Sequence, residues 1–275
     1  MFRLLRSDAY RASRFKIFYA LLIFNVLYAA FAIVTVTISN AVNRADGAAE
    51  TFTAFNVFMS GFGGGYSLIG ILTAILVSVY VGHDFSCGAI RNKLMTGAGR
   101  FNVYFAKLLV VSVMDLAVFF AYHLVNFTLG SALLGWSGAS FSSVVLPFLV
   151  GICSTLANGA IFTAVSMFSK NTVVTLLVGV LGSLVVAMLT SMLYETLAGS
   201  WELLPNGEYV RVECRLPQFL QDLARGFMNF MPSGQCFLMT VRDGCDYGVY
   251  IACSCAWIVI SSAVGAVSFS RRDLK

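Results

Sequence analysis

Apolar runs of about twenty residues recur along the whole chain, and they constrain its fold more than any other feature. A helix of ~20 apolar residues is long enough to cross the ~30 Å hydrocarbon core of a bilayer. Only 11% of the residues are charged, whereas soluble domains have about 25%. The ~10-residue alternating segments typical of a membrane β-barrel do not occur. We therefore predict an all-α, polytopic integral membrane protein.

The runs predict six spans within one transmembrane domain that covers residues 1–275. The expected spans are 17–39, 62–82, 103–133, 142–168, 172–194 and 248–269, with a large outer loop at 195–247. The first run is too long for a signal peptide and lacks a small-residue cleavage site, so we expect it to be retained. An even number of spans places both termini on one side of the membrane.

The distribution of basic residues predicts which side that is. With both termini inside, thirteen Lys and Arg fall in cytoplasmic segments and five in outer ones. Cytoplasmic loops carry an excess of Lys and Arg. We therefore expect a multi-pass protein of the cell membrane with cytoplasmic N- and C-termini. The net charge of +5 is then an orientation signal, and no nucleic-acid partner is expected.

Two further segments are predicted to lie along the membrane surface. Residues 1–16 interleave basic and aromatic side chains, which suits an interfacial helix in contact with lipid headgroups. In the outer loop, Leu216–Phe230 has apolar residues at helical spacing, with Pro217 near its start and Pro232 just after its end. This pattern predicts an amphipathic helix on or dipping into the outer leaflet.

The seven cysteines show no metal-ligand spacing, so no metal site is expected. Cys214, Cys236 and Cys245 share the outer loop, where one disulfide can form. Their odd number leaves at least one thiol without an internal partner. The sequence leaves the pairing open, and Cys236 with Cys245 is a candidate pair.

Asp115 and His123 are the strongly polar titratable residues well inside a predicted span. Intramembrane ionisable groups are costly and are commonly functional. Eight residues apart on a helix, they lie about 12 Å apart along the axis and about 80° around it, so no direct pair is expected. We expect Asp115 to face a polar cavity, or to pair with a cation on a neighbouring helix or partner chain. A structural or subunit-interface role is favoured over proton transport, because the other spans lack such groups.

Catalytic motifs are missing from the sequence. There is no HExxH, no GxSxG turn and no glycine-rich phosphate loop that ends in Gly-Lys-Ser/Thr. We expect a chain that is not an enzyme and binds no cofactor itself. If ATP drives this protein, another subunit binds the ATP and Mg²⁺.

A short polar insert, His83–Lys93, separates the second and third spans. We predict a short helix from Asp84 through Asn92, with Phe85, Ala89 and Ile90 forming an apolar face that fits a partner's groove. Basic residues at its rim would set the orientation of that contact. A glycine-marked break at Gly97–Gly99 then returns the chain to the membrane. The alternative is an ordinary positive-inside loop.

The order of residues in this insert resembles the cytoplasmic loop of type-2 ABC transporter permeases. The residues that carry the resemblance are Asp84, Gly88-Ala89-Ile90-Arg91-Asn92, Gly97 to Gly99, Arg100, Tyr104 and Lys107. The family often has Glu where Asp84 stands and Thr where Ala89 stands. The basic N-terminal segment, the six spans with a large loop before the last, and the ending Phe269–Lys275 agree with the resemblance.

The resemblance implies a permease subunit of an ATP-driven exporter. It implies a second permease chain, as a homodimer or heterodimer, and cytoplasmic ABC ATPase subunits. Residues 1–16 would be an interfacial elbow helix, and the substrate a peptide antibiotic, a lipid or a drug-like amphipathic molecule. The residues implied in coupling to the ATPase are Asp84, Phe85, Gly88, Ala89, Ile90, Arg91 and Asn92. The alternatives are a non-ABC secondary transporter or channel, and a membrane immunity protein that binds without transporting.

Overall fold

The apolar runs form long helices because a helix satisfies its backbone hydrogen bonds internally, as a bilayer requires. The computed structural model describes residues 2–45, 52–62, 68–136, 140–203, 209–212, 216–241 and 245–271. Cys214 and the C-terminal residues 272–275, on which sequence predictions also rest, lie outside this part.

Six helices of the described chain are long and apolar enough to cross a membrane, which confirms the predicted number of membrane-length helices. The third continues through a π-helical turn, η2 (Asn126–Gly130), into α7 (Ser131–Leu134). The six begin and end as follows: α2 (Lys16–Ala45), α4 (Leu68–Ser86), α6 (Arg100–Val125), α8 (Phe141–Ser169), α9 (Thr172–Ala198) and α12 (Tyr247–Arg271).

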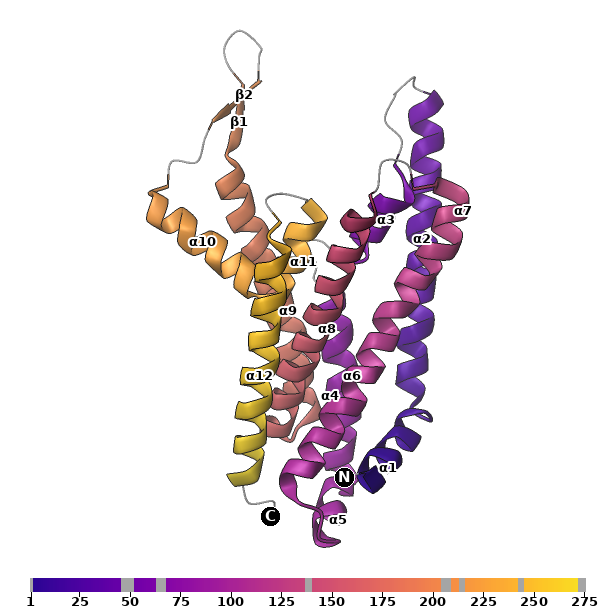
Figure 1. Cartoon of the computed structure of the whole chain (residues 1–275), viewed down its shortest axis with the longest axis vertical. Coiled ribbons are helices and arrows are strands. Elements are labelled where there is room, and N and C mark those ends of the chain that lie inside the picture. Colours follow the sequence, from indigo (N-terminus) through magenta and orange to yellow (C-terminus); the bar gives the residue numbers. More distant parts are fainter. Residues whose placement is uncertain are drawn as a thin grey trace.

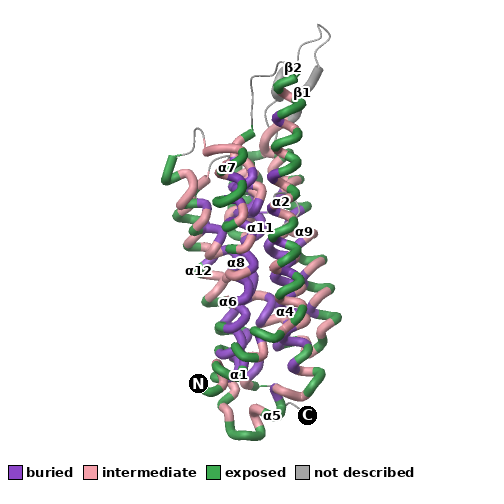
Figure 2. Tube along the Cα trace, turned by 90° about the vertical axis from the view of Figure 1, so that its right-hand side faces the viewer, coloured by how far each residue is buried: buried purple, intermediate pink, exposed green. Residues whose placement is uncertain are grey.

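The centre of the bundle is formed by α4, α6 and α8, which carry most of the buried residues (Figure 2). Helix α2 packs on α6 at one side, while α9 packs on α4 and α12 packs on α8 at the other (Figure 1). Small residues bring these helices close together: a Cβ atom at Gly179 of α9 would lie 2.7 Å from the Cβ of Ala74 on α4. Close approach of this kind is a common source of helix association in membranes.

One end of the bundle carries α1 (Phe2–Ala12) and α5 (Ala89–Met95). Helix α1 begins and α12 ends here, so both ends of the described chain lie at this end (Figure 1). We call it the α1–α5 end. Residues 2–12 form a helix, as the sequence predicts for this segment.

The opposite end carries the shorter elements α3 (Ala54–Ser60), α10 (Gln218–Phe230) and α11 (Pro232–Val241). It also carries an antiparallel hairpin of β1 (Ser200–Leu203) and β2 (Tyr209–Val212), in which Ser200 pairs with Val212. The predicted helix at Leu216–Phe230 is present as α10. Pro232 does not only stop this helix: it begins α11, a position where its missing N–H costs nothing.

Helix α11 lies against α8, α9 and α12 and is largely buried. The hydroxyl of Ser154 on α8 donates to the carbonyl of Pro232 at 3.0 Å, and that of Ser254 on α12 donates to Oε1 of Gln235 at 2.8 Å. These bonds attach α11 to two spans, so the segment before the last span is part of the packed bundle.

Candidate functional site

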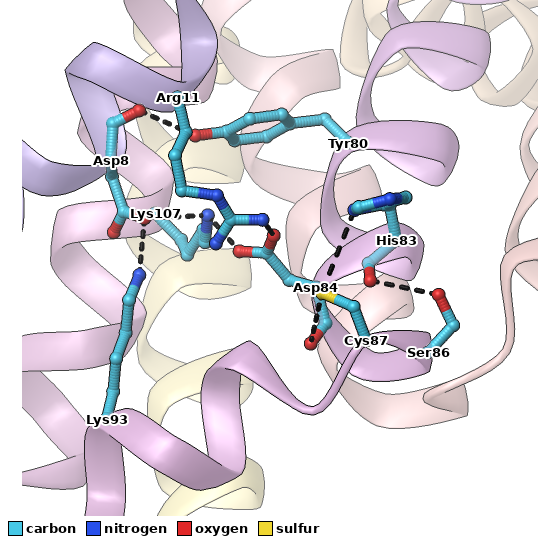
Figure 3. A network of polar contacts seen from close by, with 9 residues as sticks. All are labelled: Asp8, Arg11, Tyr80, His83, Asp84, Ser86, Cys87, Lys93 and Lys107. Atoms are coloured by element: carbon cyan, nitrogen blue, oxygen red, sulfur yellow. Dashed lines mark hydrogen bonds and ion pairs between the residues drawn. The ribbon is translucent and has the colours of Figure 1, made fainter.

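Two groups of buried polar side chains interrupt the apolar bundle. One lies at the α1–α5 end and consists of Asp8, Arg11, Asp84, Lys93 and Lys107 (Figure 3). We call it the ionic cluster. The other is a small cavity around Asp115 in the middle of the bundle.

Lys107 is the centre of the ionic cluster. Its side chain is 0% exposed, and its Nζ lies 3.0 Å from Oδ1 of Asp8 while also pairing with Oδ2 of Asp84. Arg11 pairs with the other oxygen of Asp84, and Lys93 pairs with Asp8. Lys107 therefore joins two carboxylates that each have a second basic partner.

Tyr80 of α4 completes the surroundings of Lys107. The Lys107 Nζ lies 4.2 Å from the centre of the Tyr80 ring, a cation–π contact. The Tyr80 hydroxyl donates a hydrogen bond of 3.0 Å to the backbone carbonyl of Asp8. One tyrosine thus binds the same two elements, α1 and α6, that the charges join.

The cluster holds three cations and two anions, so it has one net positive charge; Lys107 and both carboxylates are buried, whereas the Arg11 side chain is 31% exposed. Burial lowers the pKa of Lys93, and the nearby charge of Lys107 acts in the same direction, while the hydrogen bond to Asp8 opposes both. Since removing either partner of a buried pair leaves an uncompensated charge, the cluster enforces one relative position of α1, α4, α5 and α6.

The predicted helix from Asp84 through Asn92 is wrong in its bounds. Helix α4 continues to Ser86, and the chain then turns at Gly88, whose φ is +69°, before α5 begins at Ala89. A left-handed residue is costly for any side chain with a Cβ atom, so the glycine sets the turn. The second break, at Gly97 with φ +86°, ends the segment after α5.

The predicted apolar face of this insert also turns inward. Ile90 is 1% exposed and, with the half-buried Phe85, packs on the core of this chain. Asp84 is fully buried in the ionic cluster. The exposed residues of the insert are instead His83, Ser86, Cys87, Arg91 and Asn92, and Met95 just after it is also exposed. A partner that contacts this insert meets a mainly polar surface next to Met95.

Asp8 is a site residue that the sequence reading missed. It is the only acid in residues 1–16, which also contain five basic residues. A single acid in a basic segment is the sequence signal that could have identified it. Lys107 and Arg100 were assigned to the family pattern without partners. In the structure, the Arg100 guanidinium donates to the carbonyl of Ser270 near the end of α12 at 2.7 Å.

Asp115 lies inside the bundle and is 2% exposed. Thr73 of α4 donates a hydrogen bond to its carboxyl group. No ion pair involves Asp115 within the described part of the chain. Asp115 lines a small, mostly apolar cavity that also contains Asn25, Thr73 and Thr155, whereas no cation on a neighbouring helix lies beside it among the described residues.

His123 lies in separate surroundings, among aromatic rings. Neither ring nitrogen has a hydrogen-bond partner among the described residues. The centres of the neighbouring rings lie 4.3–5.4 Å away, and these rings belong to Phe58, Phe62, Phe119, Tyr122 and Phe148. Because an imidazolium would be desolvated here, His123 packs as a neutral ring.

His83, Asp84 and Cys87 place their ligand atoms within 4.8 Å of one another at the end of α4. The Asp84 carboxylate, however, already pairs with Arg11 and Lys107, which would repel a metal ion. The remaining His83 and Cys87 offer two ligands, and a structural zinc site needs four. The group is therefore a poor metal site.

Cys236 and Cys245 do not form the candidate disulfide. The Cys236 sulfur faces Ser154, 3.3 Å away, and the Cys245 thiol contacts the carbonyl of Leu238 at 3.6 Å. Burial raises the pKa of the Cys236 thiol to about 11, although the contact with Ser154 opposes the shift. Because α11 packs against α8, Cys236 contacts Ser154 and not Cys245.

The fold and these sites define a polytopic helical membrane protein with a charged cluster at one end and a polar cavity within. A scan against protein-family models gave no match, and a search of curated proteins gave none either. The function is therefore argued from the residues of this chain.

Proposed function

We propose that this chain is the membrane-spanning permease subunit of an ATP-driven ABC exporter. Six membrane-length helices are consistent with a transport protein. The sequence pattern of the insert, from Asp84 to Lys107, is the feature that points to the ABC class. ATP and Mg²⁺ would be bound by a separate ATPase subunit.

The observation that carries the proposal is the attachment of α5 to the spans. This short helix connects α4 to α6, and its Arg91 and Asn92 are exposed on the surface of the protein. Its Ile90 is buried against the core, and its Lys93 pairs with Asp8 of α1. A force applied to α5 by a partner would therefore reach α1, α4 and α6 together. Such rigid transmission is what coupling to an ATPase needs.

The proposed orientation places the α1–α5 end in the cytoplasm of the cell. This end gathers most of the basic residues, which favours the cytoplasmic side. Helix α1, with its exposed Arg3 and Arg6, would lie along anionic lipid headgroups. A second permease chain, identical or similar, would complete a path for an amphipathic substrate.

The proposal is tested by affinity purification of the tagged full chain from its native membranes. We expect an ATPase with a phosphate-binding loop to be retained, and the complex to hydrolyse MgATP. Arg91→Glu reverses an exposed charge on α5 and should release the ATPase. Arg6→Glu makes the same change on α1 and should retain it.

The two variants separate a docking surface from a general effect of charge. A stable chain that retains no ATPase in any form contradicts the proposal. So does equal retention of the ATPase by the Arg91 and Arg6 variants, because α5 would then not be the contact.

A secondary transporter is the second candidate, favoured by the buried Asp115 and its cavity. Such a protein would move substrate in vesicles that contain this chain alone, driven by an ion gradient. Transport that requires ATP and a second subunit excludes it.

A further inference from the structure

The backbone of α8 makes room for the Asp115 side chain. A Cβ atom at Gly159 would lie 2.6 Å from Oδ2 of Asp115, so any other residue there would displace the carboxyl group. Oδ2 is buried and has no hydrogen-bond partner within the described residues. The carboxyl group therefore occupies a fitted place while one of its oxygens stays unsatisfied.

A cavity of about 20 Å³ adjoins this carboxyl group. Its polar lining comes from four helices: Asn25 on α2, Thr73 on α4, Asp115 on α6 and Thr155 on α8. Since ~10–15 Å³ suffices for a water molecule with polar partners, the cavity can hold one. The site is thus a small chamber between four spans, with a few polar groups in a largely apolar lining.

The chamber is rich in acceptors and poor in donors. The Thr155 hydroxyl donates its hydrogen to the carbonyl of Gly151 at 2.8 Å, which leaves only lone pairs for the cavity. One amide hydrogen of Asn25 is used by the carbonyl of Val118 at 2.6 Å. Thr73 donates to the carboxyl group itself. The unsatisfied oxygen of Asp115 therefore receives no hydrogen from these partners, although the second amide hydrogen of Asn25 is uncommitted.

No charged group near Asp115 in the described part of the chain supplies a hydrogen bond to its unsatisfied oxygen. The residues that line the chamber from α2, α4 and α8 carry no formal charge, and the titratable group beside Asp115 on its own helix is Tyr122. Tyr122 donates its hydroxyl hydrogen away from the chamber, to the carbonyl of Val57 at 2.8 Å. Lys107 lies two turns along α6, about 12 Å away, and pairs with Asp8 and Asp84.

We propose that Asp115 is a proton-binding site of the bundle. The bound proton and one water molecule would satisfy the hydrogen-bonding groups that line the chamber between α2, α4, α6 and α8. A neutral carboxyl group supplies the missing donor and avoids a desolvated anion. Loss of the proton would leave a buried anion whose solvation needs more water or a cation than this small cavity holds. Proton occupancy therefore stabilises this arrangement of the four helices, and release accompanies their separation.

Because Asp115 is enclosed within one chain, the proposal stands independently of an ATPase partner. The site needs no contact with another subunit. The Asp115 side chain is 2% exposed and is therefore buried within this chain. The same independence lets a failure here be told apart from a failure to retain an ATPase.

Infrared difference spectroscopy of the full chain in lipid nanodiscs tests the site. We expect a C=O stretch of a protonated, buried carboxyl group that is lost in Asp115→Asn. Thr73→Val keeps the shape of the side chain but removes its hydrogen bond, so the band should move to higher frequency. If the band is absent from the folded wild-type chain, or persists in Asp115→Asn, the proposal is wrong.

A second test uses dicyclohexylcarbodiimide, an apolar reagent that adds to protonated carboxyl groups, with the modified residue located by peptide mass spectrometry. Labelling of Asp115 should decrease as the pH rises, whereas the ion-paired Asp84 serves as an internal control and should remain unlabelled. Loss of labelling or of the infrared band on adding Na⁺ but not K⁺, at constant pH, would show a sodium site and overturn the assignment to a proton. If the reagent fails to enter, the infrared band decides.

Discussion

Lys107 shows how one residue can fix the relation between distant parts of this chain. It is fully buried, and its ammonium group lies between Asp8 and Asp84, which are 99 and 23 residues away in the sequence. Each carboxylate has one further basic partner, Lys93 or Arg11. Lys107 is the one cation of the described cluster that serves both carboxylates, so its loss leaves each buried carboxylate with a single, partly exposed cation.

We predict that Lys107→Met lowers the free energy of unfolding by at most about 3–5 kcal/mol, the cost of leaving a buried charge without a partner, because Asp8 and Asp84 each keep one cation. Unfolding of the detergent-solubilised chain by increasing SDS measures the change. Lys93→Met is the matched control, because Lys93 is 13% exposed and Asp8 keeps Lys107 after its removal. Equal losses of unfolding free energy for the two variants would show that Lys107 contributes no more to stability than Lys93.

At the scale of elements, α5 depends on the turn that precedes it. Gly88 adopts φ +69°, and a Cβ atom added there would meet nothing within 4 Å, so its cost is conformational alone. Gly99 has φ −62°, and an added Cβ would make only an ordinary contact at 3.6 Å with Asn102. The two glycines flank the same segment but place different demands on the backbone.

Gly88→Ala should therefore destabilise α5 by about 1–2 kcal/mol, the cost of a left-handed residue with a Cβ atom. Faster hydrogen exchange at the amides of Ala89–Met95 would report this change, while α8 should be unaffected. Gly99→Ala should leave the exchange of α5 unchanged. Comparable effects of the two substitutions would mean that the turn geometry does not position α5.

At the scale of the whole molecule, the α1–α5 end and the opposite end differ in chemistry. The first carries the ionic cluster and the ends of α1 and α12, whereas the second carries α3, α10, α11 and the hairpin (Figure 1). Cys87 is exposed at the first end, and Ser142 is exposed near the start of α8 at the second. These two positions report the orientation of the bundle.

A membrane-impermeant maleimide should not label Cys87 in intact cells, and should label it after permeabilisation. A cysteine introduced by Ser142→Cys should react before permeabilisation. Peptide mass spectrometry distinguishes these sites from the other cysteines. The reverse pattern would place the α1–α5 end outside the cell and exclude docking of a cytoplasmic ATPase there.

Much of the architecture follows from local pattern. Apolar length predicted the six spans, and helical spacing predicted α10, because both depend only on neighbours along the chain. The short helices α3 and α11 were not expected. Phe58 of α3 packs among the rings of Phe62 and His123, and Pro232, which follows α10, also begins a helix. Both are decided by contacts with other helices.

The sequence by itself determined that the chain is an all-α membrane protein of six spans with a glycine-marked polar insert, since lipid demands long apolar helices. Only the tertiary structure decided the direction in which the insert faces and the partners of its charges. Asp84 and Ile90 turn inward because α1, α4, α5 and α6 converge, joining Arg11 to Asp84 and Asp8 to Lys107 across 73 and 99 residues. Helix packing, which no local pattern encodes, likewise left Asp115 beside an uncharged chamber.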